Sequence, residues 1–309
     1  TGDALIITNY HVVYNHSSNT KISDDINILL YGNNEYKVST LEYVIDYRSY
    51  TKHEYREFSS PYAIKATFLG GSLEYDLAVL KVSGSELMKN TDLLEAHFAN
   101  SNEITVGEKT IAVGNAASFG LSATTGCVSV DSEYLTMLGA DDITTCKFRV
   151  IRTDSAVNPG NSGGGLFNSK GELVGIVNAK TSSEKIENIG YAIPSNVVKN
   201  VVNNIIKNCD GKSNTSVIRC LFGLNIAAKN SSLKYNPATL KTYIEEEVVI
   251  VSTNKGSISD GKLSAGTIIK SVDVDYLDGS TLSLNLTRSF YLVDLSLTLS
   301  VGDTVSFNI

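Results

Sequence analysis

The segment best suited to chemistry is a glycine-rich turn around a serine, residues 158–165 with the sequence NPGNSGGG. A nucleophilic serine needs such a turn because glycine tolerates positive φ angles and lets a substrate approach the backbone closely. Backbone N–H groups must also face the oxyanion that develops during acyl transfer. Ser162 is the expected nucleophile, and the N–H groups of Gly160 and Ser162 are the expected oxyanion donors. A phosphate-binding loop or a plain turn would share these glycines, so the turn alone leaves those alternatives open.

A histidine and an aspartate elsewhere in the chain could complete a catalytic triad. His11 follows the apolar run 4–8, and Asp76 directly precedes the apolar run 77–82. In a triad the aspartate accepts from the histidine Nδ1–H, which selects the imidazole tautomer, and the other ring nitrogen takes the serine proton. Asp76 is preferred over the acids at 24, 25 and 46 because they lack a following strand. The remaining histidines lie in polar or unpatterned stretches and are expected on the surface: His16, His53 and His97.

These motifs resemble those of trypsin-like peptidases, and specifically the HtrA/DegP family. Residues 153–164 (TDSAVNPGNSGG) are similar to the family's nucleophile motif, and residues 171–176 and 190–196 to the segments that follow it. The order His, Asp, Ser is that of the chymotrypsin type. The resemblance covers about residues 1–207 and, more weakly, the C-terminal part. It implies a serine endopeptidase with the triad His11, Asp76 and Ser162, which needs no metal and no organic cofactor.

The chain departs from the family pattern at three places. The family's first β-strand is absent at the N-terminus, and the stretch between His11 and Asp76 is longer than usual. Gly165 stands where the family usually has Pro or Ala. The glycine at position 165 is not expected to remove the chemistry, whereas an absent first strand would favour a module without turnover.

The resemblance also implies the residues of the S1 pocket. Ala156 lies at its base, and Val157 and Ala179 line it. Because none is charged, an Arg or Lys at P1 would be desolvated without a partner. We therefore expect small or medium aliphatic P1 residues such as Val, Ala or Ile, with residues 178–181 pairing with the substrate backbone.

The pattern up to Pro194 predicts mostly short strands separated by turn residues, which is typical of an all-β sandwich or a pair of barrels. The expected fold is mainly β, a chymotrypsin/trypsin-like double β-barrel followed by a small PDZ-like α+β domain. A tyrosine-rich insertion at about 35–61 is expected to form a surface loop or an added hairpin.

A helix is predicted after the strand region, with Ser195 as its N-cap. Its apolar residues recur at helical spacing up to Ile206, and Asp210-Gly211 ends it. The predicted division is a protease domain at 1–208, a linker at 209–216 and a PDZ-like domain at 217–309.

The C-terminal unit carries apolar runs at 221–226, 248–252, 267–274 and 304–307 and an expected helix around 287–297. By resemblance, Phe222, Gly223 and Leu224 form a PDZ-like carboxylate-binding loop and the start of the strand after it. Such a loop captures a peptide C-terminus in a nest of backbone N–H groups beside an open strand edge. The alternative is a small β-rich domain without a peptide site.

The composition argues against several classes of protein. The chain has 309 residues, a net charge of −7, and 42% hydrophobic and 19% charged residues, which indicates an ordered globular protein. The negative charge and the absence of a basic patch argue against nucleic-acid binding. Four cysteines allow three pairings, and both two local disulfides and four free thiols fit; their spacing does not suit a zinc site.

Three functional hypotheses remain. The first is an endopeptidase acting on unfolded or damaged proteins, the second a peptide-binding or chaperone-like module without turnover, and the third a regulatory protease of narrow specificity. The expected partners are polypeptide substrates, C-terminal peptide ligands at the PDZ-like domain and, by family resemblance, other copies in a trimer. The expected location is extracytoplasmic, in the bacterial envelope or secreted, with anchoring through a segment before residue 1 as one option.

Overall fold

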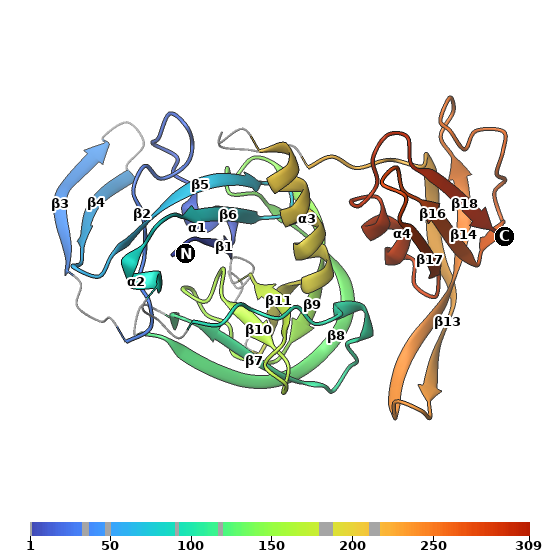
Figure 1. Ribbon diagram of the computed structural model, residues 1–309, viewed down its shortest axis with the longest axis horizontal. Helices are drawn as coiled ribbons and strands as arrows, with labels where there is room; N and C mark the ends of the chain where they lie inside the picture. Colours follow the sequence, from blue (N-terminus) through green and yellow to red (C-terminus); the bar gives the residue numbers. More distant parts are fainter. Residues whose placement is uncertain are drawn as a thin grey trace.

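The computed structural model describes residues 2–32, 37–46, 51–89, 93–116, 120–178, 188–209 and 217–309, with the backbone alone for 37–46 and 51–58. The chain is mainly β, as predicted, and Figure 1 shows a larger lobe, a helix packed against it and a smaller C-terminal lobe.

The first half of the larger lobe is a four-stranded antiparallel sheet with the order β1-β6-β5-β2. Its strands are β1 Ala4–Thr8, β2 Ile26–Ile28, β5 Ile64–Ser72 and β6 Leu77–Val82. The short helix α1, Tyr10–Val13, follows β1. Every residue of β6 except Lys81 is buried, which is typical of a central strand that is covered on both faces. Asp76 directly precedes this strand.

The expected insertion contains a hairpin. Strands β3 Lys37–Asp46 and β4 Thr51–Ser59 pair with each other in a separate two-stranded sheet, next to the first sheet in Figure 1. Of the two expected forms of this segment, a surface loop or an added hairpin, the structure has the hairpin.

The second half is a closed six-stranded antiparallel barrel with the order β10-β11-β12-β9-β8-β7. Its strands are β7 Lys109–Gly114, β8 Ser122–Leu138, β9 Thr145–Thr153, β10 Gly165–Phe167, β11 Leu173–Val177 and β12 Gly190–Pro194. The helix α2 Glu86–Lys89 and the 3-10 turn η1 Ser101–Glu103 lie in the connection between the two halves. The nucleophile turn is the connection between β9 and β10.

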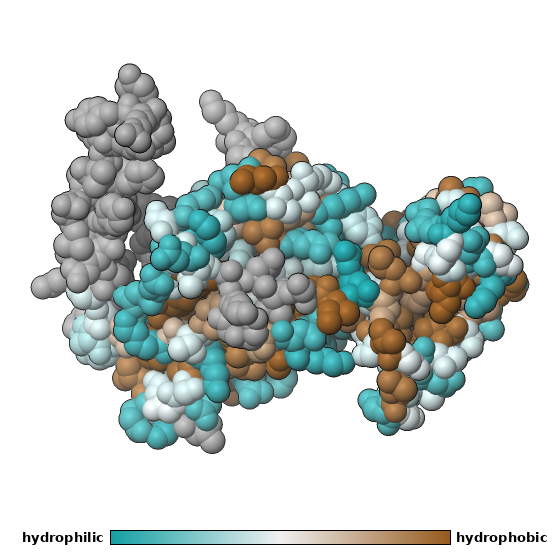
Figure 2. Space-filling view, turned by 90° about the horizontal axis from the view of Figure 1, so that it is seen from above, coloured by the Kyte–Doolittle hydropathy of each residue, from teal (hydrophilic) through white to brown (hydrophobic). Residues whose placement is uncertain are grey.

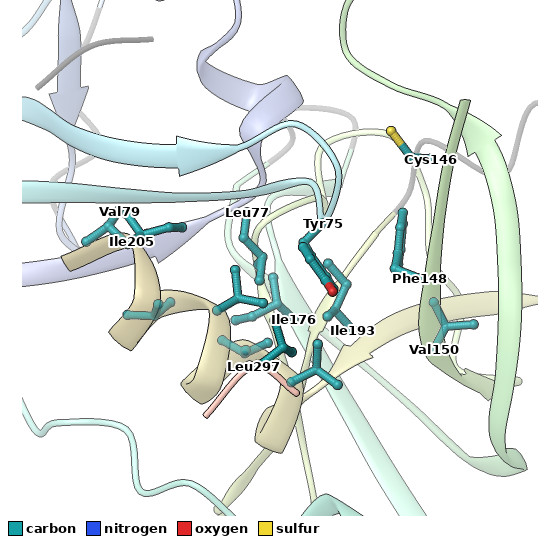
Figure 3. Packing of buried hydrophobic residues seen from close by; sticks show 14 of the residues in the cluster. Tyr75, Leu77, Val79, Cys146, Phe148, Val150, Ile176, Ile193, Ile205 and Leu297 are labelled. Atoms are coloured by element: carbon teal, nitrogen blue, oxygen red, sulfur yellow. The ribbon is translucent and has the colours of Figure 1, made fainter. Parts of the chain in front are cut away.

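Helix α3, Ser195–Asn208, joins the two halves. Its apolar stripe packs in one buried cluster with residues of both sheets and with Leu297 of the C-terminal unit, as Figure 3 shows. The start of the helix corrects one expectation: Pro194 is the N-cap and Ser195 the first helical residue. The Ser195 hydroxyl instead donates to the carbonyl of Ala99 at 2.7 Å, a tertiary contact that outweighs a local cap.

The C-terminal unit is α+β. Its two three-stranded sheets have the orders β13-β14-β15 and β17-β16-β18. The elements are β13 Leu224–Asn236, β14 Lys241–Thr253, β15 Ile268–Ile269, β16 Ser271–Asp275, β17 Thr281–Asn285, α4 Phe290–Leu295 and β18 Thr304–Asn308. Helix α4 is shorter than the expected helix at 287–297, because turns bracket it on both sides.

Ion pairs connect the C-terminal unit to the larger lobe. Arg149 on β9 pairs with Asp294 on α4 at 2.5 Å, with only 2% and 11% of these side chains exposed. The guanidinium also lies 4.0 Å from the centroid of the Phe290 ring. Burial raises the pKa of Asp294, and the positive charge of Arg149 opposes that shift. Far along the β13–β14 hairpin, Lys241 pairs with Glu108 of the larger lobe at 2.6 Å.

The four cysteines, at 127, 146, 209 and 220, form no disulfides in the part of the chain that the structure describes. Within the described ranges, no helix is long and apolar enough to cross a membrane.

Candidate active site

His11 lies on the one-turn helix α1, directly after β1. Its neighbour Tyr10 is 1% exposed and anchors the turn in the core of the first sheet, while the His11 side chain stays 19% exposed. His11 Nδ1 lies 2.6 Å from Asp76 Oδ2, and the His11 backbone N–H donates to Asp76 Oδ1 at 2.9 Å. A carboxylate accepts at both oxygens, so this geometry suits the tautomer with the proton on Nδ1 and an accepting Nε2.

Asp76 adopts a conformation that few side chains tolerate. Its φ is 51°, in the left-handed region, and only 4% of the residue is exposed. Surrounding contacts must hold such a residue in place. Asn9 Nδ2 donates to the Asp76 carbonyl at 3.0 Å, and Asn178 Nδ2 donates to Asp76 Oδ2 at 2.9 Å. The aspartate is thus held from both halves of the lobe.

The nucleophile turn has a defined conformation. The Asn161 N–H donates to the Asn158 carbonyl at 3.0 Å, which places Pro159 and Gly160 at the centre of a four-residue turn. Gly160 has φ 98°. Proline followed by a glycine of positive φ is the signature of a type II turn, which explains why the sequence has Pro-Gly here.

Strand β11 holds the other side of this turn. The Gly163 N–H donates to the Val177 carbonyl at 3.0 Å, and the Val177 N–H donates to the Gly164 carbonyl at 2.8 Å. Gly163, with φ 81°, packs so closely on Thr8 that a Cβ atom there would overlap Thr8 Oγ1. Ser162 is therefore placed beside the segment that leads into His11. The structure joins two of the predicted triad residues directly, and it brings the turn that carries the third against them.

The predicted pocket residues lie in the second barrel. Val157 is half-buried and packs against the barrel core, and a Cβ atom at Gly190 would lie 2.7 Å from Val157 Cγ2. Ala156 is exposed, and its carbonyl accepts from Thr124 Oγ1 at 2.8 Å. Ala179 lies outside the described residues. Both predicted pocket residues that the structure describes thus carry small, uncharged side chains.

Asp154 precedes the predicted pocket residues in the sequence, and its carboxylate is hydrogen-bonded to another strand of the barrel. Asp154 accepts from the backbone N–H of Cys127 at 2.6 Å, and this hydrogen bond lowers the pKa of Asp154. Ser155 is fully buried and hydrogen-bonds to Thr110 and Thr153. This hydroxyl cluster anchors the chain just before the pocket, and nothing in the sequence pattern singled it out.

The predicted PDZ-like loop lies at the start of β13. Gly223 has φ 70°, and a Cβ atom there would overlap the Ser257 side chain, so only glycine fits. The carbonyl of Phe222 accepts from Ser259 Oγ at 2.6 Å, and the Phe222 ring packs edge-on against Phe307. Leu224 begins β13, an outer strand of its described sheet.

A cavity of about 370 Å³ lies between β13, helix α4 and the larger lobe. The C-terminal unit lines it with apolar residues and with both Asp294 and Arg219, and the larger lobe contributes aromatic side chains and the cations Lys147 and Arg149. Its apolar lining from the C-terminal unit includes Ile226, Ala228 and Val293. In Figure 2 hydrophobic surface appears on the side of the C-terminal lobe that faces the larger lobe.

The other histidines agree with their expected positions where the structure describes them. His16 and His97 are exposed, and His16 makes a surface contact with Asp142 at 3.5 Å. His53 lies outside the described side chains. Sequence reasoning missed Asn9 and Asn178, because an asparagine just after an apolar run is also an ordinary turn residue.

A family comparison agrees with this fold. The model of the trypsin-like peptidase domain matches residues 1–176, more than half of the chain. The chain therefore belongs to the trypsin-like peptidase family.

Within that family the relatives are HtrA/DegP proteins. The serine protease Do-like HtrA of Lactococcus lactis subsp. lactis is 33% identical over 290 residues, which is 91% of this chain and 60% of that protein. A probable periplasmic serine endoprotease, DegP-like, of Pseudomonas savastanoi pv. phaseolicola is 37% identical over 172 residues, 55% of this chain and 32% of that protein. The chain thus spans about 60% of the length of the first of these relatives.

A solved structure shares the fold. An HtrA-type protease, a variant of AlgW with a tripeptide, matches with a TM-score of 0.50 at 22% identity over 99% of this chain and 81% of that chain.

Proposed function

We propose that the chain is a serine endopeptidase in which Ser162 attacks the scissile carbonyl and His11 takes the Ser162 proton. The observation that carries this proposal is the His11–Asp76 hydrogen bond at 2.6 Å beside a type II turn with Gly160 at φ 98°. Asp76 keeps the imidazole oriented and stabilises the imidazolium that forms. The N–H groups of Gly160 and Ser162 bind the oxyanion.

The catalytic cycle has two halves. In the first, the Ser162 Oγ–carbonyl bond forms, the peptide C–N bond breaks, and His11 returns its proton to the leaving amine. In the second, a water molecule attacks the acyl-enzyme while His11 takes a proton from it. The bond between the carbonyl carbon and Ser162 Oγ then breaks, His11 returns the proton to Ser162 Oγ, and the product leaves as a carboxylate.

The proposed substrates are unfolded or damaged polypeptides outside the cytoplasm, cleaved after small aliphatic residues. Val157 and Gly190 support this specificity, because their close approach leaves little depth and the pocket offers a cation no partner. The DegP-like relative of Pseudomonas savastanoi is named a probable periplasmic endoprotease, which supports the location.

The proposed ligand of the C-terminal unit is a peptide C-terminus that adds to the outer edge of β13. The edge position of β13 and the cavity beside α4 support this, since main-chain pairing at a sheet edge gives affinity and a pocket gives specificity.

The test is reaction with a fluorophosphonate probe and digestion of β-casein, for the wild type and for Ser162→Ala. We expect labelling and digestion that both disappear in the variant. Peptide p-nitroanilides with Val or Arg at P1 then test the pocket, with Val expected to be favoured. Folded wild-type protein that neither labels nor digests, with or without added C-terminal peptides, would instead support a binding module without turnover.

A further inference from the structure

We propose that the outer part of the β13–β14 hairpin, residues 229–243, docks on the surface of an anionic lipid bilayer. The proposal does not depend on the peptidase reaction, because it concerns a surface of the C-terminal unit and is tested by binding. Figure 1 shows this hairpin projecting from the C-terminal lobe. Its inner part packs in the core of that unit through residues such as Leu224, Ile226 and Val248, whereas the outer part lies beyond that core.

The register of the hairpin separates its side chains into two faces. Leu233 pairs with Ile244, and Tyr235 pairs with Thr242. Directly paired residues point to the same face of a sheet, as do residues two apart on one strand, so these four side chains share one face. Leu233 and Tyr235 are 72% and 58% exposed, and Leu240 in the turn at the tip is 75% exposed. The outer hairpin therefore presents a mainly apolar face to solvent.

The opposite face is mainly polar and is turned toward the larger lobe. It carries Lys234, Asn236, Lys241 and Tyr243. Lys241 Nζ donates to Glu108 Oε1 of the larger lobe at 2.6 Å. The apolar face lies on the side away from this contact. This is the reverse of the usual arrangement, in which an antiparallel sheet turns its apolar face to the protein and its polar face to water.

The charges of the segment complement an anionic surface. Residues 229–243 contain Lys229, Lys234 and Lys241 and no Asp or Glu, whereas the whole chain has a net charge of −7. All three lysines are exposed. Each lysine close to an anionic bilayer strengthens binding about fivefold. The long lysine stem can also lie along apolar groups while the ammonium reaches the lipid headgroups.

The size of the apolar face favours lipid over a second copy of the chain. A specific protein interface buries roughly 800 Å² per partner, and a face built from Leu233, Tyr235 and Ile244 offers much less. A two-fold dimer through this face would also bring the lysines of both hairpins close together, which is unfavourable. At the boundary between acyl chains and headgroups, by contrast, leucine is buried and a tyrosine ring is buried while its hydroxyl stays hydrated.

A fluorescence titration tests the proposal on the full chain. The chain has no tryptophan, so a single introduced indole reports on its own position alone. For Tyr235→Trp we expect a blue shift of the emission when vesicles of phosphatidylcholine and phosphatidylglycerol are added, and a much smaller shift with phosphatidylcholine alone. High salt should weaken the binding, because it screens the lysine charges. Tyr31→Trp is the matched control: Tyr31 is 84% exposed but belongs to the larger lobe, and its emission should stay unchanged.

Two substitutions made in the Tyr235→Trp chain separate the apolar and the charged contributions. Leu233→Ser removes apolar area and should lower the vesicle partition coefficient about tenfold. Lys234→Gln removes one charge and should lower it about fivefold, on vesicles with phosphatidylglycerol only. Leu277→Ser is the matched control, because Leu277 is 71% exposed on a turn of the same unit outside the hairpin. It should leave the partition coefficient unchanged, and thermal unfolding checks that each variant is folded.

The outcomes distinguish lipid from the other occupants of this face. An emission of Tyr235→Trp that does not shift with anionic vesicles, or a shift that Tyr31→Trp shares, overturns the proposal. A shift that appears only as the protein concentration rises assigns the face to a second copy, and one that appears only with unfolded casein assigns it to a polypeptide. Either result overturns lipid docking. None of these measurements involves labelling of Ser162, so the peptidase function is tested separately.

Discussion

The substitution Asp76→Asn tests how the carboxylate works with its three donors. Asp76 accepts from the His11 backbone N–H, from the His11 ring and from Asn178 Nδ2, at 2.9, 2.6 and 2.9 Å. An asparagine offers one accepting oxygen and one donating NH₂ group. Whichever way the amide turns, at least one of these donors then meets another donor.

The two orientations have unequal costs. With the NH₂ group at the Oδ1 position, the buried His11 backbone N–H loses its acceptor, which costs roughly 1–3 kcal/mol. With the NH₂ group at the Oδ2 position, the His11 ring can restore a hydrogen bond by moving its proton to Nε2. In that tautomer Nε2 cannot accept the Ser162 proton. Loss of the correct tautomer in a triad lowers kcat by roughly 10⁴-fold, or about 5.4 kcal/mol at 1.36 kcal/mol per factor of ten.

The assay is kcat/KM on a P1-Val p-nitroanilide, with thermal unfolding measured alongside. Asp142→Asn is the matched control, because Asp142 also contacts a histidine, His16, but both side chains are more than 60% exposed. We expect the control to keep wild-type activity. Asp76→Asn protein that is folded and retains more than a tenth of the wild-type rate would refute the tautomer reasoning.

Three further predictions concern stability and packing. Asp294→Ala leaves the buried Arg149 charge without its partner and should lower the free energy of unfolding by about 3–5 kcal/mol, measured by urea denaturation. Gly163→Ala introduces a Cβ atom that overlaps Thr8 at a φ of 81°, and should lower both the Tm and kcat/KM, the latter at least tenfold by a rough estimate. Burial raises the pKa of Tyr10 to about 12. The folded state therefore binds more protons than the unfolded state between pH 10 and 12, and stability falls as the pH rises through that window. Burial also raises the pKa values of Tyr75 and Tyr134 to about 12, so ultraviolet absorbance should show a late-ionising class of tyrosines whose amplitude Tyr10→Phe reduces by one residue.

The sequence predicted the elements that carry strong local signals. The runs at 4–8 and 77–82 are strands with those same bounds, because each is a mainly apolar stretch bounded by polar or turn residues. The nucleophile turn was equally readable, since Pro159-Gly160 favours one turn type. His11 and Asp76 could be named because each adjoins such a strand.

The sequence did not predict features that depend on long-range contacts. Ser195 is a residue type that often caps a helix, yet its hydroxyl donates to the carbonyl of Ala99, far from it in the sequence. Asn178 acquires its role from Asp76, 102 residues earlier, and no local pattern marks an asparagine for such a contact. Strand β8 is 17 residues long, whereas its apolar run predicted only 126–130, because pairing with β9 extends it through polar positions.

The C-terminal unit is attached to the larger lobe at several points in addition to the chain itself. The Arg149–Asp294 and Arg288–Asp131 pairs are largely buried, whereas the Lys241–Glu108 pair lies far along the β13–β14 hairpin. In a rotation of a rigid body, the parts farthest from the axis move the greatest distance. The long hairpin therefore works as a lever arm, because a small rotation about the buried pairs becomes a larger displacement at its far end. The Lys241–Glu108 pair would be the first contact to separate when the unit turns.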